Sequence, residues 1–416
     1  MSRALAIVAA LAIGAAACSS GTSPAPLRVG AVYPLTGLQA REGGDDEFRG
    51  VRLAADLVNR HGGIGGHRIR LVPVDVPGAD AVPQAVDRLH REGIRFLLGS
   101  YGSTISKPAA TLASRKGMLF WETGAVGEMA SAGAGRLSFR VSPSGSVLGS
   151  SAIRFVARRL APMWHRPASS LRFAVAKVDD EYGGGVGGGA VNEVRKLGLH
   201  LAGVVTYDPD RLDAVEVIRR IAAMHPDVVF VSSYLRDGIA LRKQMVAQHL
   251  RLLASIGTSS SYCMPMFGRA LGKDAVGLFA SDKPDADSIG PRGLRPGARR
   301  LLLRARTSFR KRYGQEMDAP ALAGFAAAWA LFARVMPRAG VLSPEAVAEA
   351  ARHIRLPSGS LPNGSGLEFG PPGTGRAGAN LRAASVIWEW TGIHRRSVVW
   401  PPAFATAPIR LIPLAG

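Results

Sequence analysis

The segment 102–106 reads Gly-Ser-Thr-Ile-Ser, a composition that suits the binding of a small carboxylate. It lies between an expected strand and an expected helix that has Pro108 in its first turn. The hydroxyls of Ser103 and Thr104, with the free backbone N–H groups at such a helix start, would donate hydrogen bonds to a negatively charged group. The alternative is a helix cap, an ordinary role for any one of these hydroxyls.

Two tyrosines follow expected strands in the second half of the chain. Tyr182 is expected in a loop after the apolar strand 172–178, and Tyr234 follows the strand 228–232, with Asp237 close behind it. Each ring could cover an apolar ligand or stack on a cation. The carboxyl ends of parallel strands carry the ligand in α/β folds, so this shared position favours binding over ordinary surface.

Other motifs are weaker on inspection. The run 183–189 contains a G-x-G-x-x-G match, but so dense a glycine run matches many patterns, and the acidic segment 179–181 would repel a pyrophosphate. Leu98 stands where a hydrolase nucleophile elbow needs glycine. The nine histidines are not spaced as metal ligands, and Cys263 lacks a convincing base, so we expect a small buried residue. We therefore expect a protein that is not an enzyme, with no catalytic residues, no metal and no cofactor.

Length and charge narrow the class further. The chain has 416 residues, which suits two domains, and a net charge of +21. A nucleic-acid binder would concentrate its basic residues and interleave aromatic ones, whereas here arginine is scattered and aromatics are only 6%. The one dense basic run, 295–312, has apolar residues at helical spacing, which indicates a solvated helix face; attraction to an anionic membrane is the alternative.

The N-terminus has the pattern of an export signal. Arg3 precedes an uncharged apolar run, 4–17, that is too short to span a bilayer. The run ends Ala-Ala-Ala before Cys18, which predicts a signal peptide with a lipobox over 1–18 and lipidation of Cys18; ordinary signal cleavage is the alternative. The Ser/Pro-rich segment 19–26 would be a flexible tether, so we expect an exported protein anchored by lipid on the extracytoplasmic face.

The rest of the chain alternates strands and helices. Expected strands cover 27–32, 69–74, 94–98, 118–121, 172–178, 200–205, 228–232 and 381–390, with helices over 47–60, 82–91, 191–197, 215–224, 301–313 and 319–336. The pattern restarts after 142–145. This predicts an α/β protein with two doubly wound parallel-sheet lobes, joined by a hinge with a ligand cleft between them. Lobe one would comprise 27–143 plus about 279–355, and lobe two 144–278 plus about 356–416.

The chain resembles the substrate-binding proteins of branched-chain amino-acid ABC transporters, which have the type I periplasmic binding fold. The segments that carry the resemblance are 29–37, 47–50, 58–66, 98–103, 182–183 and 226–230, above all the ordered Pro-Leu-Thr-Gly and Asn-x-x-Gly-Gly-Ile pair. The resemblance implies ligand contacts at Ser103, Gly124, Tyr182 and Tyr234.

Three positions depart from the family pattern. A threonine that often binds the ligand is Val126, the acid that meets the ligand ammonium aligns near Ser259, and an aromatic is replaced by Arg41 or Glu42. A buried ammonium without a counter-charge is costly. We therefore expect a carboxylate or amide ligand to bind more tightly than a plain branched-chain amino acid.

These observations predict a monomeric solute-binding lipoprotein of an ABC importer. It would bind a small amino-acid-like, amide or carboxylate solute at Ser103, Thr104, Gly124, Tyr182, Tyr234 and Asp237, and deliver it to the permease subunits. The resemblance and the charge pattern give no reason to expect nucleic acid. The alternative function is a ligand sensor of the same fold that signals to a partner.

Overall fold

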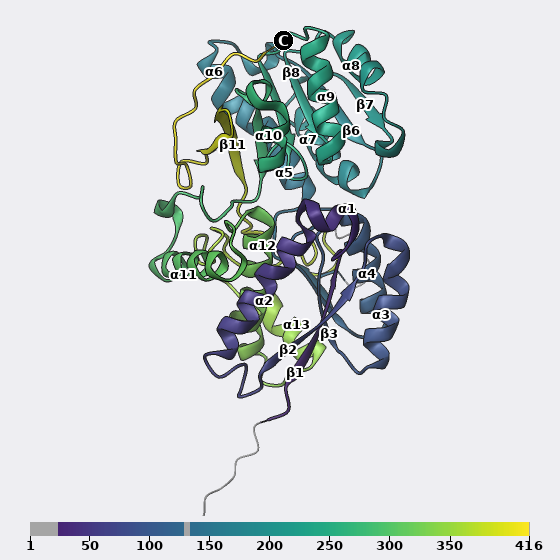
Figure 1. Cartoon of the computed structure of the whole chain (residues 1–416), viewed down its shortest axis with the longest axis vertical. Helices are drawn as coiled ribbons and strands as arrows, with labels where there is room; N and C mark the ends of the chain where they lie inside the picture. The colour runs from purple at the N-terminus through teal and green to yellow at the C-terminus, as the bar shows by residue number, and fades with distance from the viewer. Residues whose placement is uncertain (1–23, 129–133, 416) are drawn as a thin grey trace, which may run out of the picture.

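Two β-sheets, one in each half of the molecule, organise the chain (Figure 1). The computed structural model describes residues 24–128 and 134–415, so the predicted signal peptide and Cys18 lie outside the described residues. The first sheet is parallel throughout, in the order β2-β1-β3-β4-β5. Its strands are β1 (Leu27–Tyr33), β2 (Ile69–Asp75), β3 (Phe96–Gly99), β4 (Leu119–Glu122) and β5 (Ser138–Arg140).

The second sheet has the order β12-β11-β10-β9-β8-β6-β7. Strands β6 to β10 pair in parallel, whereas β11 pairs antiparallel with both β10 and β12. The bounds are β6 (Arg172–Val178), β7 (His200–Tyr207), β8 (Val228–Ser232), β9 (Ala254–Thr258), β10 (Phe279–Asp282), β11 (Val386–Gly392) and β12 (Arg395–Trp400). The structure therefore has the expected α/β architecture of two mostly parallel-sheet lobes.

Helices cover both sheets. Those of the first lobe are α1 (Gly37–Gln39), α2 (Asp45–Asn59), α3 (Val82–Arg91), α4 (Ser103–Arg115), α11 (Pro296–Tyr313), α12 (Ala319–Ala330) and α13 (Pro344–His353). Those of the second lobe are α5 (Gly145–Phe155), α6 (Ala161–Met163), α7 (Glu181–Lys196), α8 (Ala214–Ala222), α9 (Leu235–Ala247) and α10 (Pro265–Leu271). Short π-helical turns extend α1, α5 and α12, at Ala40–Gly44, Val156–Leu160 and Leu331–Val335.

The glycine run belongs to a helix and not to a loop. Helix α7 begins at Glu181, ten residues before the expected start, and Asp180 caps it by accepting the Gly183 N–H at 2.8 Å. The run allows α7 to lie against the backbone of α5: a Cβ on Gly189 would lie 2.4 Å from the Ser146 Cα. Tertiary contact thus overrides the low helix propensity of glycine.

The division of the chain between the lobes differs from the expected boundaries. Strand β10 starts at the expected boundary of 279 but pairs with β9 in the second sheet. Residues 366–380 lie against the first lobe, since Arg140 pairs with Ala379 and the Phe369 ring packs 5.4 Å from Trp121. Only β11 and the residues after it complete the second sheet. The chain therefore crosses between the lobes after β5, after β10 and between residue 380 and β11.

The continuous helical stretch Ala319–Arg338 is long and apolar enough to cross a membrane, and 78% of its most apolar window is buried inside the protein. It packs against α2 at a close backbone approach, where a Cβ on Gly50 would lie 2.0 Å from the Ala321 carbonyl oxygen. It is thus the core helix of the first lobe.

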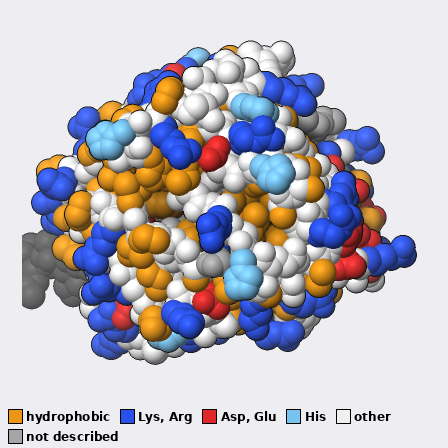
Figure 2. All heavy atoms as spheres, turned by 90° about the horizontal axis from the view of Figure 1, so that it is seen from above, with side chains coloured by type: hydrophobic (Ala, Val, Ile, Leu, Met, Phe, Trp, Pro, Cys, Tyr) orange, Lys and Arg blue, Asp and Glu red, His pale blue; other side chains and the backbone are white. Residues whose placement is uncertain are grey.

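The basic segment 295–312 forms α11, with Ala298, Leu302, Ala305 and Phe309 buried on one face. Most of its arginines are exposed on the other face, in agreement with the solvated face expected there. Figure 2 shows Lys and Arg side chains scattered over the end of the molecule that it views, among hydrophobic ones, rather than gathered in one patch.

Candidate ligand-binding cleft

A narrow cavity lies between the lobes. Helix starts and strand ends of both lobes supply its walls, as the parallel-sheet rule requires. The lining residues are Gln39, Tyr101, Gly102, Ser103, Gly124, Val126, Tyr182, Tyr234, Ser259, Ser260, Asp282, Lys283 and Pro320. Of the residues predicted from sequence, Ser103, Gly124, Tyr182 and Tyr234 meet here, whereas Thr104 and Asp237 do not.

Ser103 is the first residue of α4, directly after β3 and a short turn. The Ser103 hydroxyl oxygen accepts the Gly127 N–H at 2.8 Å, and no side chain caps α4 in the described residues. The helix starts earlier than expected, so Pro108 is its sixth residue and not part of the first turn. The backbone N–H groups of Ile105 and Ser106 donate to the Gly102 carbonyl oxygen, so those of Ser103 and Thr104 are the ones available to a negatively charged ligand.

The Gly124 loop is held from beneath by a buried carboxylate. Glu122 Oε1 accepts backbone N–H groups from Ser100, Thr123, Gly124 and Ala125 at 2.9–3.1 Å. Burial, with the neighbouring charge of Glu47, raises the pKa of Glu122 well above its usual value. A Cβ at position 124 would lie 1.7 Å from Glu47 Oε2, so a larger residue there would displace the buried Glu47 side chain.

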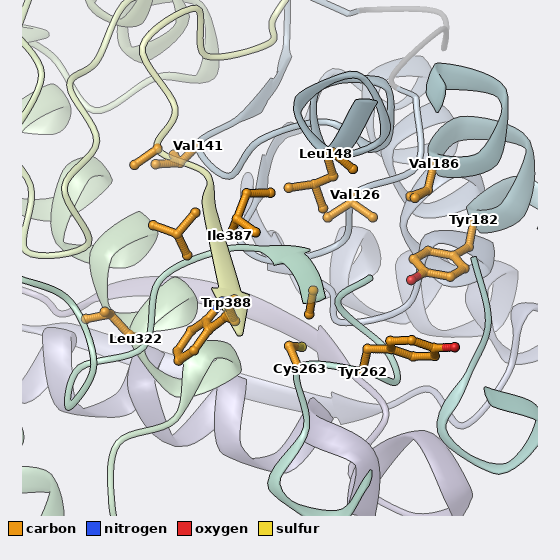
Figure 3. Packing of buried hydrophobic residues seen from close by; sticks show 14 of the residues in the cluster. Val126, Val141, Leu148, Tyr182, Val186, Tyr262, Cys263, Leu322, Ile387 and Trp388 are labelled. Carbon is orange, nitrogen blue, oxygen red and sulfur yellow. The ribbon is translucent and has the colours of Figure 1, made fainter. Parts of the chain in front are cut away.

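The two tyrosines stack on each other at the second lobe's side of the cleft. Their ring centroids are 5.3 Å apart and the planes differ by 29°. Tyr182 lies in the first turn of α7 and not in a loop, with its hydroxyl 2.7 Å from Thr258 Oγ1; burial raises its pKa to about 12. Tyr234 precedes α9 and donates to Asp180 Oδ2 at 2.5 Å. The pair gives the cleft a rigid aromatic wall (Figure 3 shows Tyr182 within the surrounding buried cluster).

Asp237 has a structural role in this arrangement. Its Oδ2 accepts the Tyr234 N–H at 3.1 Å and the Tyr207 hydroxyl at 2.6 Å, which completes a cap at the start of α9. Burial raises its pKa to about 6. This position does not bear out the expected ligand contact, because the carboxylate turns back to its own helix.

The cleft also holds two charged residues, adjacent in sequence, that the sequence did not lead us to expect there. Asp282 and Lys283 stand at the end of β10, and both are nearly fully buried. Lys283 Nζ donates to the Gly124 carbonyl oxygen at 2.9 Å, across the cleft. Asp282 Oδ2 accepts the Cys263 thiol at 2.8 Å, while its Oδ1 has no partner among the described residues. The available signal was an apolar strand, 278–280, that runs directly into polar residues.

Two of the four residues at positions that depart from the family pattern lie at the cleft. Val126 and Ser259 line the cleft, whereas Arg41 and Glu42 do not. Tyr101, which the sequence reasoning did not select, lines it as well, and its hydroxyl donates to the Glu42 carbonyl oxygen at 2.9 Å. Ser259 supplies no charge, but Asp282 gives the cleft an acid from a different strand.

The described residues at the cleft include neither a reactive thiol nor a metal-binding cluster. Cys263 is buried, as expected, and desolvation raises the pKa of its thiol well above the usual value, so the thiol stays protonated. No group of three or more His, Cys, Asp or Glu side chains is placed to hold a metal within residues 24–128 and 134–415.

Comparison with known proteins identifies the family. A family model described as "Periplasmic binding protein" matches residues 26–387. The chain belongs to this family. Its members are solute-binding proteins and not enzymes, and they act outside the cytoplasm.

Relatives and solved structures are similar to this chain over most of its length. "Leu/Ile/Val-binding protein homolog 8" of Brucella suis is 24% identical over 409 residues, which cover 98% of each chain. A leucine binding protein from Thermotoga maritima matches with a TM-score of 0.74 at 16% identity, over 89% of this chain and 97% of that one. A substrate binding protein from Streptococcus pneumoniae, in complex with isoleucine, matches with a TM-score of 0.70 at 16% identity, over 90% and 100%. These similarities confirm the expected type I periplasmic binding fold.

Proposed function

We propose that this protein is the lipid-anchored substrate-binding component of an ABC importer. It captures a small amino-acid-like, amide or carboxylate solute between its lobes and delivers it to the permease subunits as a monomer. The observation that carries this proposal is the interlobe cleft, whose walls combine an uncapped helix start at Ser103, a stacked tyrosine pair and a buried lysine. Such a mixture of a few convergent polar groups and apolar surface is typical of small-molecule sites.

The lobes touch across the cleft at charged and polar groups. Lys107 on α4 forms an ion pair with Glu181 on α7 at 2.6 Å, and Lys283 reaches Gly124 in the opposite lobe. These contacts suit a closed form that opens by rotation at the three crossovers. Residues 19–26, which follow a lipidated Cys18, would tether this body to the extracytoplasmic face of the membrane.

A thermal-shift screen against amino acids, amides and carboxylates tests the solute-binding role. A ligand at 100 times its Kd adds about 2.7 kcal/mol to the stability, so a true solute gives a saturable rise in melting temperature. The uptake of that solute should then be lost when the gene is deleted and restored by the intact gene. A screen without any saturable shift would contradict binding, and unchanged uptake would favour the sensor role.

A further inference from the structure

Lys283 is a buried cation that forms no ion pair with a carboxylate within residues 24–128 and 134–415. Lys283 is 5% exposed, and in the described part of the chain its Nζ makes one hydrogen bond, to the uncharged Gly124 carbonyl. Among the described residues, the lysines that form ion pairs are Lys107 and Lys116. Removing an ammonium group from water costs several kcal/mol unless a counter-charge is close. An anion in the cleft would accept hydrogen bonds from the remaining N–H groups of Lys283 and offset this cost.

The nearby carboxyl groups do not meet this need by contact. Asp282 precedes Lys283 in the chain, but its Oδ2 is held by Cys263, and the two side chains form no ion pair. Glu47 lies behind Gly124 and accepts the Thr123 hydroxyl at 2.6 Å; burial raises its pKa to about 8, which keeps it largely protonated at neutral pH. Lys283 thus has no carboxylate in contact with it and can bind an anion that enters the cleft.

The opposite wall supplies matching donors. Of the helices that start at the cleft, α7, α9 and α12 are capped by the carboxylates of Asp180, Asp237 and Asp318. Helix α4 has no side-chain cap in the part of the chain that the structure describes. The positive end of α4 and the Ser103 hydroxyl therefore face the cleft from the first lobe, and Lys283 faces it from the second. An anion placed between them would contact both lobes.

An ammonium group would compete with Lys283 in the same cleft. The Gly124 carbonyl, an acceptor at the loop, is already occupied by Lys283. Asp282 is the acid of the lining, and its Oδ1 has no partner among the described residues. Burial raises the pKa of this carboxyl and the Lys283 charge already lowers it in part, so a cation placed beside Asp282 would also lie near the Lys283 ammonium. Apolar surface from Val126, Pro320 and the tyrosine pair remains for a hydrocarbon body.

We propose that Lys283 binds the carboxylate of the ligand, together with Ser103 and the first turn of α4, and that the ligand is a small apolar monocarboxylate without an ammonium group. This inference rests on the proposed solute-binding function and names the solute class. Because the carboxylate joins Lys283 to α4, its binding also holds the lobes closed.

Four compounds that share one carbon skeleton distinguish the contributions of the carboxylate and the ammonium to binding. These are 4-methylpentanoate (carboxylate), leucine (carboxylate and ammonium), 4-methylpentylamine (ammonium) and 4-methylpentanamide (neither). Calorimetry on the wild-type protein should show 4-methylpentanoate binding at least tenfold more tightly than each of the others, and 4-methyl-2-oxopentanoate should behave like 4-methylpentanoate. Leucine binding tighter than both acids would overturn the inference and assign the ammonium to Asp282.

Substitution of the lysine tests its role directly. Lys283→Met should weaken carboxylate binding at least tenfold and leave amide binding unchanged, while Lys283→Arg, which keeps the charge, should retain part of the affinity. Lys243→Met makes the same chemical change on the exposed surface of α9 and should have no effect. Carboxylate affinity that survives in a folded Lys283→Met protein would refute the assignment.

The two proposals fail in different ways. If neither the four compounds nor any solute of the thermal-shift screen stabilises the wild-type protein, the solute-binding function itself is wrong, and this inference with it. If a carboxylate from the screen binds equally well to wild type and Lys283→Met, the function stands and the role of Lys283 is wrong.

Discussion

The glycine run of α7 contains positions with opposite expected responses to alanine. A Cβ on Gly189 would lie 2.4 Å from the Ser146 Cα and 2.7 Å from the Ser146 carbonyl oxygen. These are backbone atoms of α5, so a side-chain rotation cannot relieve the contact. Gly184 and Gly188, in the same helix, have nothing within 4 Å of an added Cβ. The run therefore contains one position in close contact with α5 and two positions with space for a side chain.

The expected changes in the free energy of unfolding follow from helix propensity and packing. Alanine at Gly184 or Gly188 should stabilise the protein by about 0.5–1 kcal/mol each, because alanine loses less backbone entropy in a helix. Together they should add about 1–2 kcal/mol. Gly189→Ala has the same propensity gain, but separating α7 from α5 costs about 1–3 kcal/mol or more. We expect Gly189→Ala to be destabilising on balance.

Urea unfolding followed by tryptophan fluorescence gives the measurement. Trp388 and Trp390 are buried in the sheet of the same lobe, so they report on its unfolding. With an m-value on the order of 3 kcal/mol/M, the double variant Gly184→Ala/Gly188→Ala should raise the midpoint by about 0.3–0.7 M, and Gly189→Ala should lower it. If all three substitutions shift the midpoint in the same direction, close helix packing does not explain the run.

Three further predictions use other parts of the molecule. Wild-type protein should fractionate with membranes and Cys18→Ser should be soluble; equal fractionation would contradict lipidation. The saturating solute should reduce the radius of gyration in X-ray scattering as the lobes close, and an unchanged radius would count against closure. Burial raises the pKa of Glu47 from 4.5 to about 8, so the native state holds a proton that the unfolded state releases, and stability should fall as the pH rises from about 5 to 8. Glu47→Gln should reduce this loss by at least about 1 kcal/mol; an identical pH profile of the two unfolding midpoints would refute the buried, protonated state of Glu47.

Local patterns in the sequence determined the architecture. The apolar runs 172–178 and 228–232 predicted β6 and β8 with the bounds that the structure has, because a strand buried on both faces needs a continuous apolar segment. The alternation of these runs with amphipathic helices predicted the parallel sheets. The strand-end rule also placed Ser103, Tyr182 and Tyr234 at one cleft, since the carboxyl ends of parallel strands meet at one edge.

Only the tertiary structure decided which polar groups face the cleft. Lys283 meets Gly124 across 159 positions of sequence, and no local pattern encodes such a contact. Asp237 turns to its own helix start, because the N–H groups there compete for its carboxylate. The glycine run became a helix since only glycine lets α7 approach α5 so closely. Propensity and periodicity act over a few residues, whereas burial and close packing depend on segments that meet only in the folded protein.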